Sequence, residues 1–186
     1  MSKINTMKIF VASSTAAKSQ AKAFIKGCSR AGVDFLPWWD QFTAGKTLLD
    51  ELTQIRNQID RAIIILSPES DTKLRGRKQP IPNLNVLFEF GFFYGALRTL
   101  GPDNVAVVRY GQVYLPSDLG GYIHINGSKR FARGAAVKVG KQTKTEFERW
   151  LDAPKKAQAA ALEAIYAKVT GSNLRSRETI QERGKS

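Results

Sequence analysis

Short apolar runs recur along the sequence, and segments with helical periodicity separate them. The runs predicted as strands are residues 8–12, 33–36, 62–66, 105–108 and 122–125. The run at 62–66, Ala-Ile-Ile-Ile-Leu, is apolar throughout, as expected for a strand buried on both faces. Apolar residues repeat at helical spacing over 17–28, 48–59 and 86–97. Strands that alternate with helices predict an α/β fold with a five-stranded parallel sheet and flanking helices.

Five such strands favour the flavodoxin-like strand order 2-1-3-4-5. In open sheets of this kind, ligands bind beyond the carboxyl ends of the strands, at the point where the strand order reverses. We therefore expect functional residues at 13–15, at 38–42 and from residue 67 onward. The polar segment 71–82 is predicted to be a long loop, and such loops often act as lids over functional sites.

The charge of the chain is strongly basic and unevenly distributed. Its 186 residues carry a formal net charge of +13, of which +5 falls on residues 1–126 and +8 on residues 127–186. We predict a domain over 1–126 and a basic, helical C-terminal extension over 127–186. The surplus of positive charge favours anionic partners such as nucleotides. Nucleic acid is not favoured, because the tail lacks a zinc finger, an RNP motif or basic residues interleaved with aromatic ones.

The composition excludes several classes of protein. One cysteine and one histidine leave no disulfide framework and no Cys- or His-based metal site, so no metal is expected. The N-terminus has no signal-peptide pattern. The densest apolar stretch, 86–97, is far shorter than the roughly 20 residues a membrane helix needs. The protein is therefore expected to be soluble and cytoplasmic.

Glu89 is the most informative residue in the chain. It is the only charge in a predicted helix that is otherwise apolar nearly all round, and such a helix is expected to be buried. A buried carboxylate must be paired, protonated or directed into a cavity. The alternative is a glutamate stabilised by the dipole of an early helical turn. Asn85 lies four residues earlier on the same face and would be a second sugar-binding group, or simply the helix N-cap.

Further candidate residues follow the first two strands. Ser13, Ser14 and Thr15 precede a helix, where backbone N–H groups bind phosphate well, although ordinary capping explains them equally. Trp39, Asp40 and Phe42 follow the second strand, together with Trp38. One of these aromatic rings would stack on a base or a nicotinamide, and core packing is the alternative.

The order of several sequence blocks resembles that of one family. The blocks are KIFVASS, a Trp/Asp/Phe segment followed by GKTLLDEL, AIIILSPES, NVLFEFGFFYGAL and LPSDLGGYIHI. Together they cover about residues 7–126 and resemble the bacterial TIR-like domain family, whose members serve as effectors of CBASS- and Pycsar-type anti-phage systems.

The resemblance implies a flavodoxin-like TIR fold and NAD⁺ glycohydrolase activity, with NAD⁺ as substrate and no cofactor. It implies that Glu89 is the catalytic residue and that the serines after the first strand contact the nucleotide. Many members carry an arginine and an acid where this chain has Asn83-Leu84. Arg75, Arg77 and Lys78 are candidates to replace that arginine. With no sensor domain of its own in these residues, the chain is expected to be triggered by self-association or by a separate sensor protein.

Cleavage by a single acid is chemically reasonable. The nicotinamide–ribose bond breaks through an oxocarbenium-like state, as in glycoside hydrolysis. Nicotinamide leaves as a neutral group from a pyridinium cation, so it needs no proton from a general acid. One carboxylate can hold the ribose hydroxyls, stabilise the developing cation and orient water.

Two other functions fit the same residues. A nucleoside deoxyribosyltransferase-like N-glycosidase also uses a lone glutamate beside a pentose. A non-enzymatic TIR-like adaptor would bind a nucleotide or a partner domain and signal by assembly, with the basic tail as its docking element. We expect the tail to pack on the sheet domain or on another copy through Phe147, Trp150 and Leu151.

Overall fold

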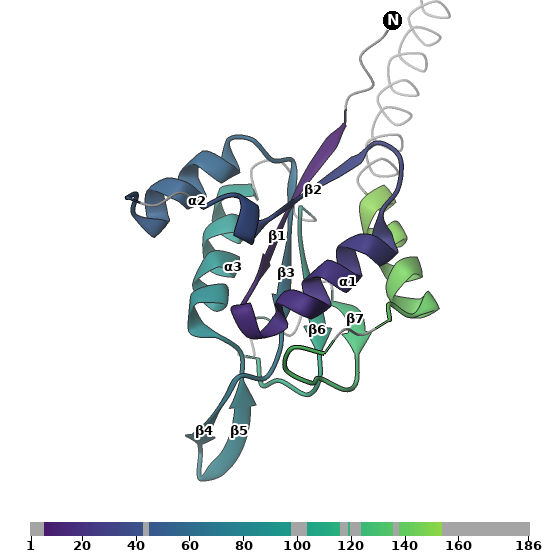
Figure 1. The fold of residues 1–186 in the computed structure, drawn as a ribbon. Helices are drawn as coiled ribbons and strands as arrows, with labels where there is room; N and C mark the ends of the chain where they lie inside the picture. The colour runs from purple at the N-terminus through teal and green to yellow at the C-terminus, as the bar shows by residue number, and fades with distance from the viewer. Residues whose placement is uncertain are drawn as a thin grey trace, which may run out of the picture. The chain divides into compact units, whose positions relative to one another are not determined.

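The computed structural model describes residues 6–42, 45–97, 104–115, 119, 124–135 and 138–153. Its centre is a five-stranded parallel sheet in the order β2-β1-β3-β6-β7 (Figure 1). The strands are β1 (Met7–Ser13), β2 (Val33–Pro37), β3 (Arg61–Leu66), β6 (Val105–Tyr110) and β7 (His124–Ser128). The predicted α/β class and the strand order 2-1-3-4-5 are confirmed.

Helices cover both faces of the sheet, which is why its inner strands are apolar. The helical elements are η1 (Thr15–Ala17), α1 (Lys18–Cys28), η2 (Trp38–Asp40), α2 (Leu48–Arg56) and α3 (Leu84–Leu97). All six residues of β3 are buried. On one face α2 and α3 close a core that includes Phe10, Ile64 and Phe93. Figure 1 shows α1 on the other face of the sheet.

The helices on the α3 side begin at side-chain caps. Thr47 Oγ1 accepts a hydrogen bond from the backbone N–H of Asp50 (3.2 Å) and so caps α2. At the start of α3, Asn83 Oδ1 accepts from the backbone N–H groups of Asn85 (2.9 Å) and Val86 (3.4 Å). Asn83 is therefore the cap, which leaves the side chain of Asn85 exposed.

The segment predicted as a long loop is a β-hairpin. Its strands are β4 (Ser70–Leu74) and β5 (Arg77–Ile81), paired antiparallel. The turn is Arg75-Gly76, and both residues have positive φ (49° and 77°), as a two-residue type I′ turn demands. The loop prediction was wrong because both faces of the hairpin are largely polar, so the strands carry no apolar alternation.

The expectation that α3 is buried all round was also wrong. The helix buries one face against the sheet, yet Leu84 is 67% exposed and Phe88 is 53% exposed. An apolar composition without a polar face gives no periodicity from which the buried side could be chosen.

The chain divides into two compact units, Met1–Trp150 and Leu151–Ser186. In the first, β7 continues past the domain boundary predicted at residue 126, and residues 141–150 are helical. The rings of Phe24 and Phe35 lie 5.6 and 5.9 Å from that of Phe147. Part of the predicted extension therefore packs on α1 and β2, as expected for Phe147. Of the second unit only residues 151–153 are described, and they are helical.

Some predictions concern residues outside the described ranges. They are the segments 116–118 and 120–123 of the LPSDLGGYIHI block, and the predicted helical extension beyond residue 153. None of the described helices has the length and apolar character needed to cross a membrane.

Candidate functional site

The strand order reverses between β1 and β3, so a crevice is expected beyond the carboxyl ends of these two strands. A cavity of about 410 Å³ lies there. Its lining comes from four places in the chain and consists of Thr15, Ala16, Glu69, Asn83, Arg133 and Gly134. Among the predicted site residues, Thr15 is the one that lines this crevice.

The crevice holds an acid, an amide and a cation. Asn83 Nδ2 donates a hydrogen bond to Glu69 Oε2 (3.1 Å), while Glu69 Oε1 is buried without a partner among the described residues. Arg133 is held in place because Gln20 Nε2 donates to the carbonyl oxygens of Ala132 (2.8 Å) and Ala135 (3.1 Å). The lining thus offers an arginine and a carboxylate oxygen without a hydrogen-bond partner among the described residues, both of which can bind hydroxyl or phosphate groups.

Glu89 is buried on α3. It is 8% exposed, and its Oε2 atom has no hydrogen-bond partner among the described residues. Burial raises the pKa of the Glu89 carboxyl to about 7, because the charged form is desolvated. One turn further along the helix, the Phe93 ring lies 4.9 Å from that of Phe10. Glu89 thus belongs to the helix face that packs toward β1.

An aromatic cluster connects β1 with the turn after β2. Trp38 Nε1 donates a hydrogen bond to Ser13 Oγ (2.9 Å). The Trp38 ring lies 5.9 Å from the Trp39 ring, edge to face, and 6.4 Å from the Phe42 ring. Trp38 and Phe42 pack against the same core as Phe90, the neighbour of Glu89. The structure therefore places the predicted aromatic residues and the helix of Glu89 around one core.

Two lysines of α1 lie over this cluster. Lys18 Nζ is 5.0 Å from the centre of the Trp39 ring, and Lys22 Nζ is 5.8 Å from it. Cation–π contacts of this kind hold positive charge beside the indole faces. Neither lysine was predicted from the sequence as a site residue. Asp40, at the end of η2, is exposed.

The remaining predicted residues have structural partners or lie apart. Ser14 Oγ accepts from the backbone N–H of Ala17 (3.2 Å) and so caps η1. Neither Glu89 nor Asn85 lines the crevice; Glu89 is buried on α3, and Asn85 is exposed. No three His, Cys, Asp or Glu side chains gather as a metal site within the described ranges.

Comparison with known families shows which group of proteins the chain belongs to. Residues 8–129 match the family model described as "CAP12/Pycsar effector protein, TIR domain". The chain belongs to this family. The TIR-like resemblance inferred from the sequence is thereby confirmed.

Individual relatives support the same assignment. The TIR domain is 37% identical over 89 residues to CD-NTase-associated protein 12 of Sphingobacterium faecium, covering 48% of this chain and 27% of that protein. It is 35% identical over 92 residues to the Pycsar effector protein PaPycTIR of Pseudomonas aeruginosa, covering 47% and 29%. An uncharacterized protein of Escherichia coli, YuaY, is 28% identical over 104 residues, covering 52% and 32%. The chain thus matches about three tenths of the length of each relative.

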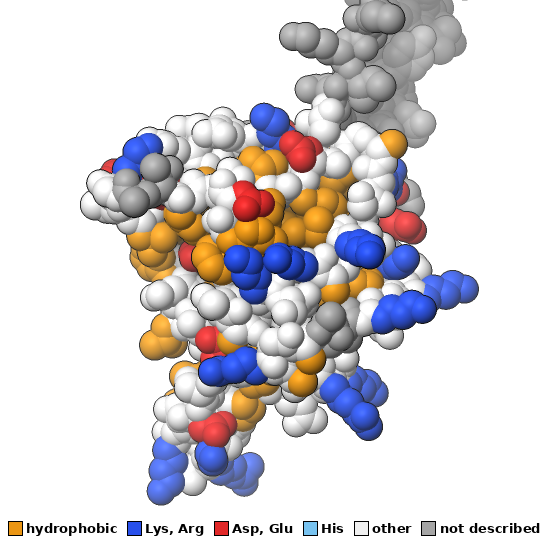
Figure 2. All heavy atoms as spheres, in the orientation of Figure 1, with side chains coloured by type: hydrophobic (Ala, Val, Ile, Leu, Met, Phe, Trp, Pro, Cys, Tyr) orange, Lys and Arg blue, Asp and Glu red, His pale blue; other side chains and the backbone are white. Residues whose placement is uncertain are grey.

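The three cations suggested as replacements for the missing arginine do not line the crevice. Arg75 and Arg77 are exposed at the tip of the β4–β5 hairpin, where Figure 2 shows a group of Lys and Arg side chains. Lys78 pairs with Asp71, with Nζ 2.8 Å from Oδ2. Arg133, some fifty residues further along the chain, lines the crevice instead.

Proposed function

We propose that this TIR domain is an NAD⁺ glycohydrolase and an effector of bacterial anti-phage defence, with Glu89 as its catalytic residue. The observation that carries the proposal is the carboxyl group of Glu89, buried in an apolar helix with one oxygen unpartnered. Burying such a group costs several kcal/mol, so a fold retains it where a ligand supplies the partner.

The proposed reaction breaks the bond between the ribose C1′ and the nicotinamide nitrogen. The bonding electron pair leaves with the nitrogen, which turns the pyridinium cation into neutral nicotinamide. The ionised Glu89 carboxylate stabilises the oxocarbenium-like ribose, and a water molecule adds to C1′. The products are nicotinamide, ADP-ribose and one proton. The positive charge of bound NAD⁺ favours the ionised form of Glu89, which burial alone disfavours.

We assign the rest of the substrate to two other parts of the domain. The aromatic cluster of Trp38, Trp39 and Phe42 offers ring faces for a base or nicotinamide. Ser13 fixes the orientation of Trp38. We assign Arg133 to the diphosphate, in place of the arginine that Asn83-Leu84 replaces.

The partners of this chain belong to the same proposal. The name of one relative connects that protein with a CD-NTase, and the name of another calls it a Pycsar effector. For this chain we propose activation by self-association or by a separate sensor protein.

The test is nicotinamide release from NAD⁺ by the purified chain under crowding conditions. The variants are Glu89→Gln and, as a control, Glu51→Gln, which changes another buried glutamate on α2. We expect release by the wild type and the control and a loss of at least about a hundredfold in Glu89→Gln. Equal release by wild type and Glu89→Gln would refute the catalytic assignment.

Two other outcomes identify the alternative functions. Exchange of bases between deoxynucleosides, with NAD⁺ left intact, would indicate a deoxyribosyltransferase-like enzyme. Tight nucleotide binding without turnover would indicate an adaptor.

A further inference from the structure

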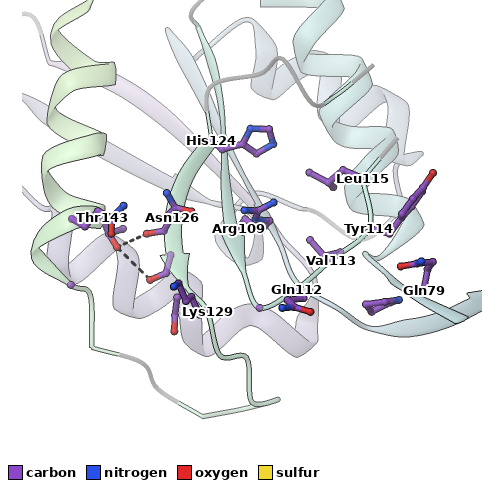
Figure 3. Close-up of a pocket in the computed structure, with 16 residues that line it drawn as sticks. Gln79, Arg109, Gln112, Val113, Tyr114, Leu115, His124, Asn126, Lys129 and Thr143 are labelled. Carbon is purple, nitrogen blue, oxygen red and sulfur yellow. Dashed lines mark hydrogen bonds between the residues drawn. The ribbon is translucent and has the colours of Figure 1, made fainter. Parts of the chain in front are cut away.

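A second and larger cavity lies on the other side of the sheet's carboxyl edge, beside β6 and β7 (Figure 3). Its volume is about 1300 Å³, and it shares no residue with the crevice between β1 and β3. The walls come from β5, from the end of β6 and the chain after it, from β7 and the residue after it, and from residues 140, 142 and 143. This is more space than the roughly 300–1,000 Å³ of a typical small-molecule site.

Apart from Tyr114, the ionisable side chains that line this cavity are all bases. They are Arg109 on β6, His124 on β7 and Lys129 just after it. Glu146 lies near Asn126 but does not line the cavity, and Asn126 and Gln142 already donate hydrogen bonds to its carboxylate. A cavity with cationic walls attracts an anion.

The sheet directs two of these bases to the same place. Val107 pairs with His124 and Arg109 pairs with Asn126, so Arg109 and His124 lie diagonally on one face of neighbouring strands. A β-bulge follows at Arg109/Tyr110. Figure 3 shows both side chains extending from their strands into the cavity. Such bulges re-aim the side chains next to them.

The side chain of His124 gives a second, independent indication that this cavity binds a ligand. Its Nε2 atom is buried and has no hydrogen-bond partner among the described residues. Burial and the nearby Arg109 lower the pKa of the imidazole, which favours its neutral form. A neutral imidazole nitrogen without a partner can be satisfied by a phosphate oxygen or hydroxyl.

The opposite wall carries groups suited to a nucleobase. Tyr114 is 43% exposed and offers a ring face. Gln79 and Gln112 add amide groups beside it. We propose that this cavity is a second nucleotide site, which holds the phosphate groups at Arg109, His124 and Lys129 and the base at Tyr114. It is separate from the catalytic site proposed above.

The single histidine of the chain makes the proposal directly measurable. One imidazole Cε1–H signal in the proton NMR spectrum reports on the cavity. We expect ADP to shift this signal in a saturable way in the full chain, and adenosine to leave it unchanged. Pyrophosphate should bind more weakly than ADP. A signal that millimolar ADP does not move would overturn the proposal, as would adenosine or pyrophosphate binding as tightly as ADP.

A double variant separates this cavity from the crevice. Arg109→Gln with Lys129→Gln should raise the dissociation constant for ADP, read at His124, by about tenfold or more. The charge-matched control is Lys26→Gln with Arg149→Gln, both exposed and outside the lining, and it should bind ADP as the wild type does. Equal affinity in the two double variants would refute the site.

Failure here is distinguishable from failure of the NAD⁺ hydrolase. Glu89→Gln should leave the ADP-dependent shift of His124 intact whether or not Glu89 is catalytic. Loss of that shift in Glu89→Gln, with the signal unaffected by Arg109→Gln and Lys129→Gln, would assign ADP to the other site.

Discussion

Trp38 Nε1 and Ser13 Oγ lie 2.9 Å apart, and the indole N–H donates its hydrogen bond to the hydroxyl oxygen. The Ser13 hydroxyl in turn donates to the carbonyl oxygen of Ser14 (3.2 Å). Ser13 is 5% exposed, so this contact is largely shielded from water. It ties the end of β1 to the turn that begins the aromatic cluster.

The first prediction concerns this pair. Ser13→Ala removes the acceptor and leaves the indole N–H of Trp38 unsatisfied, which should lower the free energy of unfolding by about 1–3 kcal/mol. Urea denaturation of Ser13→Ala, Trp38→Phe and the double variant measures the coupling. We expect a coupling energy above about 0.5 kcal/mol. Strictly additive effects would show that the hydrogen bond contributes nothing.

The second prediction concerns stability and pH. The folded protein holds the pKa of Glu89 at about 7, above the 4.5 of an ordinary glutamate. The folded state therefore binds this proton more tightly than the unfolded state does. The stabilisation of the folded state by this proton is fully present below the pKa of the unfolded state. It is lost as pH rises through the pKa of the folded state. As pH rises from about 4 to 8, the free energy of unfolding of Glu89→Gln should increase by about 3 kcal/mol relative to that of the wild type.

Urea denaturation at several pH values measures that difference. Glu148→Gln, an exposed glutamate in the helix over 141–150, is the control and should follow the wild type. A difference between Glu89→Gln and wild type that does not change with pH would mean that the carboxyl of Glu89 titrates normally.

The third prediction concerns the pH dependence of catalysis. If the ionised carboxylate of Glu89 acts on NAD⁺, kcat/KM should rise with pH and level off above a midpoint near the pKa of about 7. The midpoint for kcat should be lower, because the pyridinium charge of the bound substrate favours the carboxylate. Initial rates of nicotinamide release test this. A flat profile across this range would contradict it.

The fourth prediction concerns the helix over 141–150. Phe147 is 1% exposed between Phe24 and Phe35, so Phe147→Ala should lower the free energy of unfolding by about 3–5 kcal/mol. Phe88→Ala is the matched control, because Phe88 is 53% exposed and its truncation should cost less than about 1 kcal/mol. Similar losses in both variants would show that the helix over 141–150 is not part of the core.

The fifth prediction compares two helical glycines. A Cβ at Gly95 of α3 meets nothing within 4 Å, so Gly95→Ala should stabilise the protein by about 0.5–1 kcal/mol. A Cβ at Gly27 of α1 would lie 2.8 Å from Val139 Cβ, so Gly27→Ala should be destabilising. Thermal unfolding of the two variants gives the signs, and equal shifts would be inconsistent with this packing.

The fold was predictable because its strands are apolar runs that end at turn residues. The run at 62–66 is buried at every position, since helices cover both faces of the sheet. The hairpin of β4 and β5 escaped prediction because its strands are mostly polar. Its only local signal was Arg75-Gly76, where two residues of positive φ make the turn.

The site was predictable only in part. Glu89 stands out in the sequence as the lone charge in an apolar helix; the structure shows it buried, and the raised pKa follows from that burial. Arg133 and Lys18 could not be found in the same way. Periodicity identifies residues that face a core, whereas these cations reach the site through tertiary folding of segments distant in sequence.

Arg61 joins the start of β3 to the end of the helix over 141–150. It opens β3, and its guanidinium lies 4.9 Å from the Trp150 ring and donates a 3.0 Å hydrogen bond to the Trp150 carbonyl. Residue 150 is therefore anchored at the amino edge of the sheet, where Met7 also begins β1. The crevice and the cavity beside β7 lie at the carboxyl edge. Within the described residues of the first unit, the start of β1 and residue 150 thus both lie at the edge of the sheet opposite to these two sites.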